Sequence, residues 1–263
     1  MKTPDYSQYL IRVQKQSPLI LCLTNLVTIT DCANALLAIG ASPVMSDDKA
    51  DAADLAAIAS ALVVNIGTIS EAQEIVMDSA IERAKFKGIP IILDPVGAGA
   101  TPRRLTAANK FSSKASVIRG NASEILALCG ASPGQKGVDS IAASNFEVMV
   151  EKAKILAASL GVVVAVTGPT DIVTDGNETM KIEGGHELMT KLTGTGCLLT
   201  AITGAYVAAS PDNPLAATAA ALWHLALAGE RAHLGLKGSD KSLGAYKTLL
   251  FDQIAQITPR DLA

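Results

Sequence analysis

A glycine-rich run directly before an apolar segment is the strongest chemical signal in the chain. Thr193-Gly194-Thr195-Gly196-Cys197 opens a predicted helix. Glycine lets a backbone approach a ligand closely, and a helix N-terminus offers unpaired N–H groups at the positive end of its dipole. The pattern predicts an anion hole for a transferring phosphoryl group, where Cys197, in the first turn that tends to lower a thiol pKa, accepts a proton from a substrate hydroxyl. The spacing equally fits a connecting loop with Cys197 packed as a small apolar residue.

Two carboxylates follow apolar runs. Asp94 ends the run Ile-Pro-Ile-Ile-Leu-Asp, and Glu124 stands in Asn121-Ala122-Ser123-Glu124 at the start of a predicted helix. Carboxylates in such places suit Mg²⁺, bound directly or through water. The competing interpretations are a turn cap for Asp94 and a helix cap for Glu124, the latter favoured when Glu124 is taken singly.

A cation and a hydroxyl end two further apolar runs. Arg119 could clamp phosphate oxygens in a bidentate manner, or pair with Asp94 or Glu124. Thr167 with Gly168 could offer a hydroxyl and an N–H to a phosphate or ribose, although a plain strand exit fits the pattern as well.

Near the N-terminus, amides, apolar side chains and a thioether occur together. Asn25 and Val27 lie in Thr-Asn-Leu-Val-Thr, and Met45 follows Ala-Ser-Pro-Val. This mixture suits a small, flat, mostly apolar heterocycle with one or two polar atoms. Taken alone, Asn25 is better explained as a helix cap and Met45 as core filler.

The elements that must position these residues follow a strand–helix alternation. Continuous apolar runs predict strands buried on both faces of a sheet, at residues 18–24, 43–46, 61–66, 89–94, 116–119 and 161–167. Helices are expected at residues 30–39, 70–87, 122–129, 145–160, 197–209, 215–233 and 239–256, and an edge hairpin at 171–175 and 180–183. The alternation predicts one domain over residues 1–263, with a three-layer α/β fold and a mostly parallel central sheet flanked by helices. In such sheets ligands bind at the carboxyl ends of the strands, so the polar residues ending these runs should converge on one rim.

Composition excludes several classes of function. The 263 residues carry a formal net charge of −3 and no basic tract, which argues against nucleic acid and a polybasic membrane surface as partners. No apolar stretch is long enough to span a bilayer. The four cysteines occur singly, which favours reduced thiols in the cytoplasm, and the three histidines lack zinc-site spacing. The chain has neither a P-loop nor a dinucleotide fingerprint after its first predicted strand.

Six motifs together resemble one family, the hydroxyethylthiazole kinases of the ribokinase-like superfamily. In sequence order they are Thr24-Asn25-x-Val27-Thr28, Gly40-Ala41-Ser42-Pro43-x-Met45, Asn65-Ile66-Gly67-Thr68, Asp94-Pro95-Val96-Gly97-Ala98-Gly99-Ala100, Arg119-Gly120-Asn121-x-Ser123-Glu124 and Thr193-Gly194-Thr195-Gly196-Cys197. The resemblance extends over roughly residues 18–235. It implies a ribokinase-like fold and ATP-dependent phosphorylation of the primary alcohol of 4-methyl-5-(2-hydroxyethyl)thiazole in thiamine salvage.

The resemblance also implies roles for single residues. Met45 and Gly194 would contact the thiazole, with Asn25 and Val27 nearby. Arg119, Thr167 and Asn121 would bind ATP, and Asp94 and Glu124 would organise Mg²⁺ and its waters. Cys197, in the catalytic run with Gly194, Thr195 and Gly196, would sit at the reacting hydroxyl, where the wider superfamily usually has Asp. Family members form homotrimers with active sites between subunits, which suits a chain whose N-terminal motifs need not meet residues 194–197 within one subunit.

Two other functions remain open at this point. A related kinase acting on hydroxymethylpyrimidine or pyridoxal would keep the fold and the chemistry, although Cys197 and the Thr24-Asn25 motif favour thiazole. A non-catalytic nucleotide-binding sensor would keep the pocket without turnover. Release of ADP, and the alcohol on which it depends, separates the three.

Overall fold

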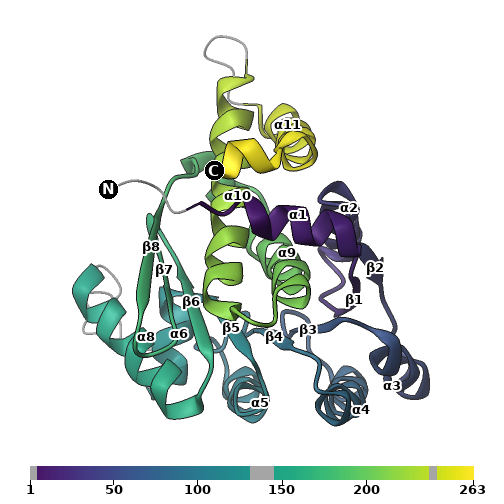
Figure 1. Cartoon of the computed structure of the whole chain (residues 1–263). Coiled ribbons are helices and arrows are strands. Elements are labelled where there is room, and N and C mark those ends of the chain that lie inside the picture. The colour runs from purple at the N-terminus through teal and green to yellow at the C-terminus, as the bar shows by residue number, and fades with distance from the viewer. Residues whose placement is uncertain (1–4, 131–144, 237–241) are drawn as a thin grey trace.

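A computed structural model describes residues 5–130, 145–236 and 242–263. Within them, eight strands form one sheet in the order β2-β1-β3-β4-β5-β6-β7-β8 (Figure 1). The strands are β1 Leu19–Leu23, β2 Ser42–Val44, β3 Ala61–Asn65, β4 Ile91–Asp94, β5 Val117–Asn121, β6 Val163–Thr167, β7 Thr170–Thr174 and β8 Thr179–Glu183. Strands β1 to β6 pair in parallel, and β7 and β8 add an antiparallel hairpin at one edge. The predicted sheet and edge hairpin are confirmed.

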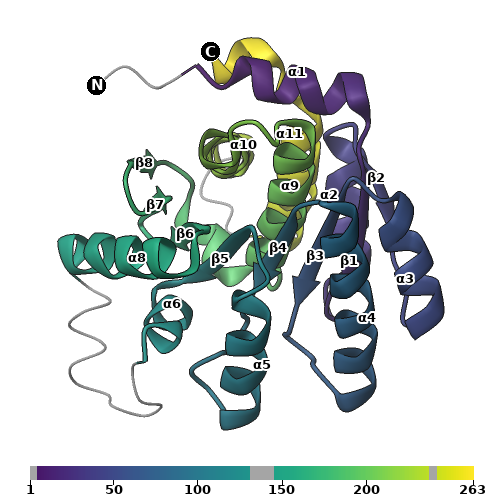
Figure 2. The ribbon, with the colours of Figure 1, turned by 60° about the horizontal axis from the view of Figure 1, so that its bottom comes forward.

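Helices cover both faces of the sheet and make three layers (Figure 2). One layer holds α1 Ser7–Gln16, α2 Ile29–Ala38, α9 Thr195–Ala209, α10 Pro214–Leu234 and α11 Leu243–Gln256. The other holds α3 Lys49–Ile58, α4 Glu71–Lys87, α5 Pro102–Ser112, α6 Ala122–Leu128 and α8 Phe146–Leu160. Because the central strands are buried on both faces, their apolar residues alternate between two separate cores.

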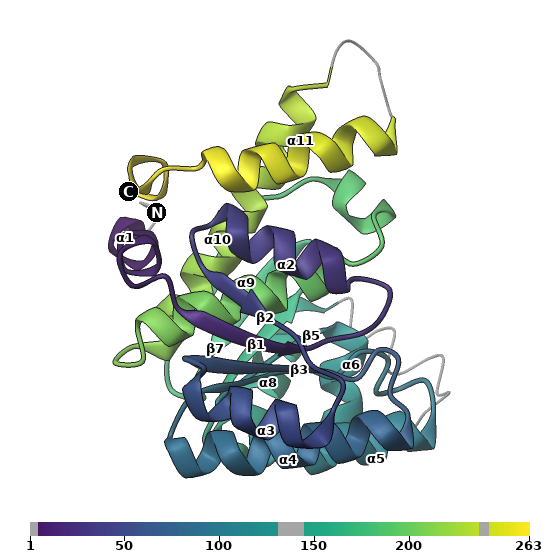
Figure 3. The same ribbon diagram turned by 90° about the vertical axis from the view of Figure 1, so that its right-hand side faces the viewer.

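Two short 3₁₀ helices complete the described chain. The first, η1 Glu187–Lys191, leads into α9, and the second, η2 Pro259–Leu262, ends beside α1. The backbone N–H of Tyr6 donates to the carbonyl of Leu262 at 2.8 Å, so the two ends of the described chain lie side by side (Figure 3). Of the predicted last helix, positions 239–241 lie outside the described residues.

Three observed helices, α1, α3 and α5, were not predicted. Helix α3 has the sequence KADAADLAAI and buries only Ala52 and Ala56, so it lacks the large apolar stripe by which a helix is recognised. Helix α1 buries Tyr9, Leu10 and Val13 within an otherwise polar segment. Helix α5 starts where the Thr101 hydroxyl accepts from the N–H of Arg104, with proline in its first turn.

Helix α9 belongs to the apolar interior of the molecule, although it is too short to cross a membrane. Its residues from Leu198 to Val207 are buried between the sheet and helix α10. No helix in the described parts of the chain is long and apolar enough to span a bilayer.

Candidate active site

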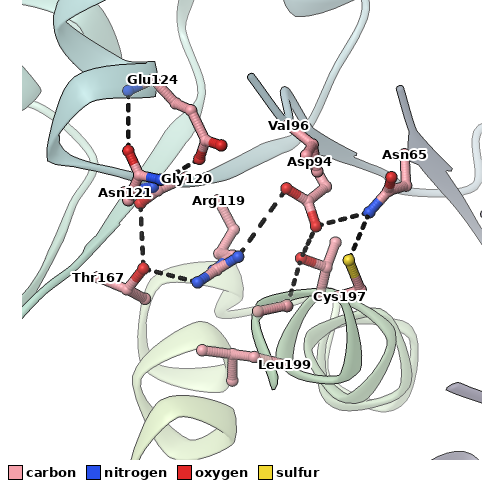
Figure 4. A network of polar contacts seen from close by, with 12 residues as sticks. Asn65, Asp94, Val96, Arg119, Gly120, Asn121, Glu124, Thr167, Cys197 and Leu199 are labelled. Atoms are coloured by element: carbon pink, nitrogen blue, oxygen red, sulfur yellow. Dashed lines mark hydrogen bonds and ion pairs between the residues drawn. The ribbon is translucent and has the colours of Figure 1, made fainter. Parts of the chain in front are cut away.

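The polar residues that end the strands share one rim of the sheet, as predicted. Asn65 of β3 is in register with Asp94 of β4, and Asn121 of β5 is in register with Thr167 of β6. All of these strands are parallel, so their carboxyl ends open toward the same side. The start of α9 reaches this rim, where Cys197 lies within hydrogen-bonding distance of Asn65 (Figure 4).

Asn65 is the hub that connects the N-terminal motif to the carboxylate of β4. Its Nδ2 donates to Asp94 Oδ2 at 2.8 Å and lies 3.3 Å from Cys197 Sγ. Its Oδ1 accepts from Asn25 Nδ2 at 3.1 Å and from the N–H of Gly67 at 2.9 Å. With donors and acceptors all engaged, the amide has one orientation only.

Asp94 is fully buried and uses its two carboxylate oxygens differently. Oδ2 accepts from Asn65 and from the Thr200 hydroxyl, the latter at 2.9 Å. Oδ1 has no hydrogen-bond partner in the described structure and faces Arg119 Nη1 at 3.9 Å. Burial raises the pKa of Asp94 to about 6, and the neighbouring charge of Arg119 opposes this shift.

Arg119 reaches from β5 toward the same point. Its Nη2 donates to the Thr167 hydroxyl at 2.6 Å, while its buried Nε has no partner in the parts of the chain described. A Cβ at position 196 would overlap Nη1, which explains why glycine is needed there. The guanidinium therefore lies against the first turn of α9 and pairs loosely with Asp94, one of the two pairings expected for it.

Glu124 combines the two interpretations weighed for it. Its Oε2 accepts from the N–H of Asn121, and the Asn121 Oδ1 accepts from the N–H of Glu124, which together form a capping box for α6. Its Oε1 accepts from the N–H of Gly97 at 2.9 Å, so the same carboxylate joins the loops after β4 and β5. The negative charge of Glu124 also contributes to the raised pKa of Asp94.

The donor set at this rim fits a hydrated Mg²⁺ ion. Asp94 Oδ1 is a buried carboxylate oxygen without a hydrogen-bond donor, which is costly unless a cation is bound. Among the described residues there is no group of three or more His, Cys, Asp or Glu side chains placed to hold a metal. Mg²⁺ usually keeps several waters and takes one or two carboxylates plus phosphate oxygens, so two acidic residues suffice.

The start of α9 is built from a left-handed glycine. Gly194 has a φ of +94°, and a Cβ there would collide with the Thr28 side chain. The helix begins without a side-chain cap, and its first-turn residues Thr195 and Gly196 line a cleft. The Thr195 hydroxyl donates to carbonyls of η1 and its end, at Met189 and Leu192, so the backbone of this turn is what it can offer an anion.

For Cys197 the expected lowering of the pKa is wrong. Burial, followed by the nearby negative charge of Asp94, raises the pKa of its thiol above the ordinary value. These effects outweigh the first-turn position of the residue and the hydrogen bonds from Asn65 and Asn25, whose Nδ2 is 3.1 Å from Sγ. The thiol is therefore protonated at neutral pH and is poorly suited to act as a base.

A cleft of about 550 Å³ opens beside these groups. Arg119, Asn121 and Thr167 form part of its polar wall. Its other end is apolar, and the residues lining that end are Met189, Leu199, Leu222, Leu225 and Ala226. A cleft with cationic, hydroxyl and apolar walls suits a ligand that combines phosphates with a flat base.

The residues expected to hold the thiazole are only partly brought together. Asn25 is buried and contacts Cys197 within the same chain, which contradicts the idea that the N-terminal motif and residues 194–197 meet only across subunits. Met45 instead lines a separate cavity of about 220 Å³, together with Thr24 and Leu26. Val27 is 65% exposed and lines neither cavity.

Three residues of the site were not among the predicted functional residues. Asn65 had a readable signal, because it is a polar residue that ends an apolar strand. Thr200 had only its helical spacing of three residues from Cys197. Asp171 of β7 lines the cleft and accepts from the N–H of Gly168 at 2.9 Å, and burial raises its pKa to about 6.

Known proteins share both the sequence and the fold. Residues 10–260 match the model of the hydroxyethylthiazole kinase family. A hydroxyethylthiazole kinase of Methanocella arvoryzae is 44% identical over 265 residues, which cover 100% of this chain and 97% of the relative.

Solved structures agree with this assignment. The structure of a hydroxyethylthiazole kinase protein from Pyrococcus horikoshii OT3 has a TM-score of 0.84 and 38% identity, and the match covers 95% of this chain and 92% of that one. A ribokinase-like superfamily protein of Enterococcus faecalis, at 14% identity, shares the fold alone, with a TM-score of 0.62 and coverage of 98% and 92%. The six motifs, the eight-stranded sheet and these full-length similarities agree that the chain belongs to the hydroxyethylthiazole kinase family.

Proposed function

We propose that this protein transfers the γ-phosphoryl group of ATP to the primary alcohol of 4-methyl-5-(2-hydroxyethyl)thiazole, giving the thiazole phosphate and ADP for thiamine salvage. The observation that carries the proposal is the pairing of Asp94 Oδ1 with Arg119 Nη1 beside the uncapped start of α9. A carboxylate for a cation, a guanidinium and helix N–H groups are the parts that phosphoryl transfer requires. The names of the full-length relatives support thiazole as the acceptor.

Charge stabilisation is the main task of these residues. Asp94 and Glu124 would hold Mg²⁺ and its waters, and the ion supplies positive charge between the phosphates. Arg119, oriented by Thr167, binds phosphate oxygens, and Asn121 borders the same part of the cleft. The backbone of residues 194–196 stabilises charge on the transferring group. Cys197, protonated, packs at the reacting hydroxyl and shapes its position.

The thiazole subsite is proposed to include Met45, Gly194, Asn25 and Val27, completed by a neighbouring subunit in a homotrimer. Leu26 and Val27 support this, because they are 71% and 65% exposed although both are large and apolar. Sedimentation of the purified protein tests the assembly: a trimer that Leu26→Asp dissociates, with loss of activity, supports it. A fully active monomer would exclude it.

We further propose that the chain is one catalytic domain and works in the cytoplasm, without nucleic acid or membrane as partner. The described strands all belong to one sheet. All four cysteines are free, which suits a reducing compartment where ATP is available.

The deciding experiment measures ADP release from Mg·ATP with hydroxyethylthiazole, hydroxymethylpyrimidine, pyridoxal or no acceptor. Release that depends on hydroxyethylthiazole alone supports the proposal. Release with another alcohol keeps the kinase chemistry and replaces the substrate. ATP binding without release with any acceptor points to a sensor.

A further inference from the structure

Arg104 makes a contact that the catalytic proposal does not use. It lies in the first turn of α5 and reaches back to the rim of the sheet, where its Nη2 donates to the carbonyl of Gly67 at 2.7 Å. Its Nη1 donates to the carbonyl of Val96 at 3.3 Å. One planar guanidinium therefore joins the loop after β3 to the loop after β4.

Each of these loops presents an N–H group to a site residue. The N–H of Gly67 donates to Asn65 Oδ1, and Asn65 in turn donates to Asp94. The N–H of Gly97, next to Val96, donates to Glu124 Oε1. The two proposed metal-binding carboxylates thus depend on two loops whose relative position Arg104 holds.

The fit between Arg104 and the second loop is close. Gly97 has a φ of +68°, and a Cβ there would overlap Arg104 Nη1. The guanidinium therefore occupies the space that the glycine leaves free. Its charge has no carboxylate within ion-pairing distance among the described residues, whereas Arg103 beside it pairs with Glu74 on the surface. Arg104 acts by geometry, since both its acceptors are backbone carbonyls.

We propose that Arg104 is a positioning residue for the phosphoryl transfer: by bonding the carbonyls of Gly67 and Val96 it holds Asp94 and Glu124 at the mutual placement that the phosphates and their cation need. The inference rests on the proposed function of these two carboxylates. Small displacements of positioned groups cost about 100-fold in rate, so Arg104 controls activity without touching the substrate.

Hydrogen–deuterium exchange of the protein without ligands tests the positioning independently of any activity. In Arg104→Ala, the amides of Gly67 and Gly97 should exchange about ten times faster, because the loops that orient them lose their link. Arg103→Ala is the matched control, since it removes a guanidinium from the same turn but only a surface ion pair, and exchange there should stay unchanged. Unaltered protection in Arg104→Ala would overturn the proposal whatever the protein phosphorylates.

Kinetics supply the second readout. Arg104→Ala should lower kcat by about 10- to 100-fold and raise the Mg²⁺ concentration for half-maximal rate, with the KM for the alcohol little changed. Added guanidinium ion should restore part of kcat, and Arg103→Ala should stay within about twofold of the parent. Failure of guanidinium to restore any rate, or equal losses in both variants, would contradict the proposal. If Arg104→Ala does not fold, Arg104→Lys carries the same measurements, because its single ammonium can bond only one of the carbonyls at a time.

Discussion

Asp94 keeps one carboxylate oxygen for the protein and leaves the other for a ligand. Asn65 and Thr200 both donate to Oδ2, and Oδ1 stays without a donor. This asymmetry orients the carboxylate before any ligand arrives, which is how a buried charge serves catalysis without reorganising. The hydroxyl of Thr200 comes from an otherwise apolar helix, so its role is open to a clean test.

Thr200→Val should lower kcat about tenfold, because valine keeps the shape of threonine but removes a hydrogen bond to a buried carboxylate, a loss of about 1.5–3 kcal/mol. Thr203→Val is the matched control: that hydroxyl is equally buried but donates to the carbonyl of Leu199 in its own helix. Steady-state rates at saturating substrates measure both. Equal losses in the two variants would show that burial of a hydroxyl in α9, rather than the contact with Asp94, is responsible.

Cys197→Ser should reduce kcat only a few-fold, whereas Asp94→Ala and Arg119→Ala should reduce it by about 100-fold or more. The Cys197 thiol has a raised pKa and stays protonated, and the loose transition state of phosphoryl transfer depends on charge stabilisation more than on proton removal. The same steady-state assay gives this ranking. Similar losses in all three variants would refute it.

At the scale of elements, the junction between η1 and α9 brings the anion-binding turn to the rim. Gly194 adopts a left-handed conformation, and the Thr28 side chain occupies the space above it. The N-terminal motif and the catalytic turn therefore interlock within one chain. A side chain at position 194 must disturb both the backbone and this contact.

Gly194→Ala should lower the free energy of unfolding by more than the roughly 1–2 kcal/mol that a left-handed alanine costs, and should lower kcat at least about tenfold. Gly161→Ala separates the two causes. Gly161 also has a positive φ of +67°, but no atom lies within 4 Å of its added Cβ, so only backbone strain should appear there. Urea unfolding and steady-state rates report the difference; comparable effects of both substitutions on activity would exclude crowding by Thr28.

At the scale of the whole molecule, His224 joins three helices of one layer. From α10, its Nδ1 lies 2.6 Å from the Tyr206 hydroxyl of α9, and its Nε2 lies 3.0 Å from the carbonyl of Ile254 in α11. The carbonyl can only accept, so Nε2 carries the proton and Nδ1 accepts from tyrosine. Complete burial lowers the pKa of this histidine to about 4, so the folded protein keeps it neutral.

The stability of the native protein should therefore fall relative to His224→Gln as the pH drops. The unfolded histidine takes up a proton below its ordinary pKa of 6.5, while the folded one resists until about 4, so the contribution present at pH 7 is lost as the pH falls through this window. The difference should amount to about 2 kcal/mol between pH 7 and pH 5. Asp94 and Asp171, whose raised pKa values act in the opposite direction, are present in both proteins and cancel. Urea titrations at the two pH values measure it, and a constant difference would disprove the assignment.

Prediction of elements from the sequence depended on large apolar residues. The continuous strands and the apolar helices α9 and α10 were readable because burial on a sheet demands such runs. Helix α3 was not, because its alanines pack closely without forming an apolar stripe. Arg104 was overlooked together with helix α5, since its importance lies in the carbonyls it meets across two loops.

The sequence by itself determined the fold class, the family and the rim on which the site lies, because strand periodicity and the placement of polar residues at strand ends are properties of local chain. The tertiary structure alone decided how those residues work. It set the protonated state of Cys197, the division of Asp94 between protein and ligand, and the meeting of Asn25 with Cys197. Each of these depends on burial and on distances between residues far apart in the chain, which no local pattern records.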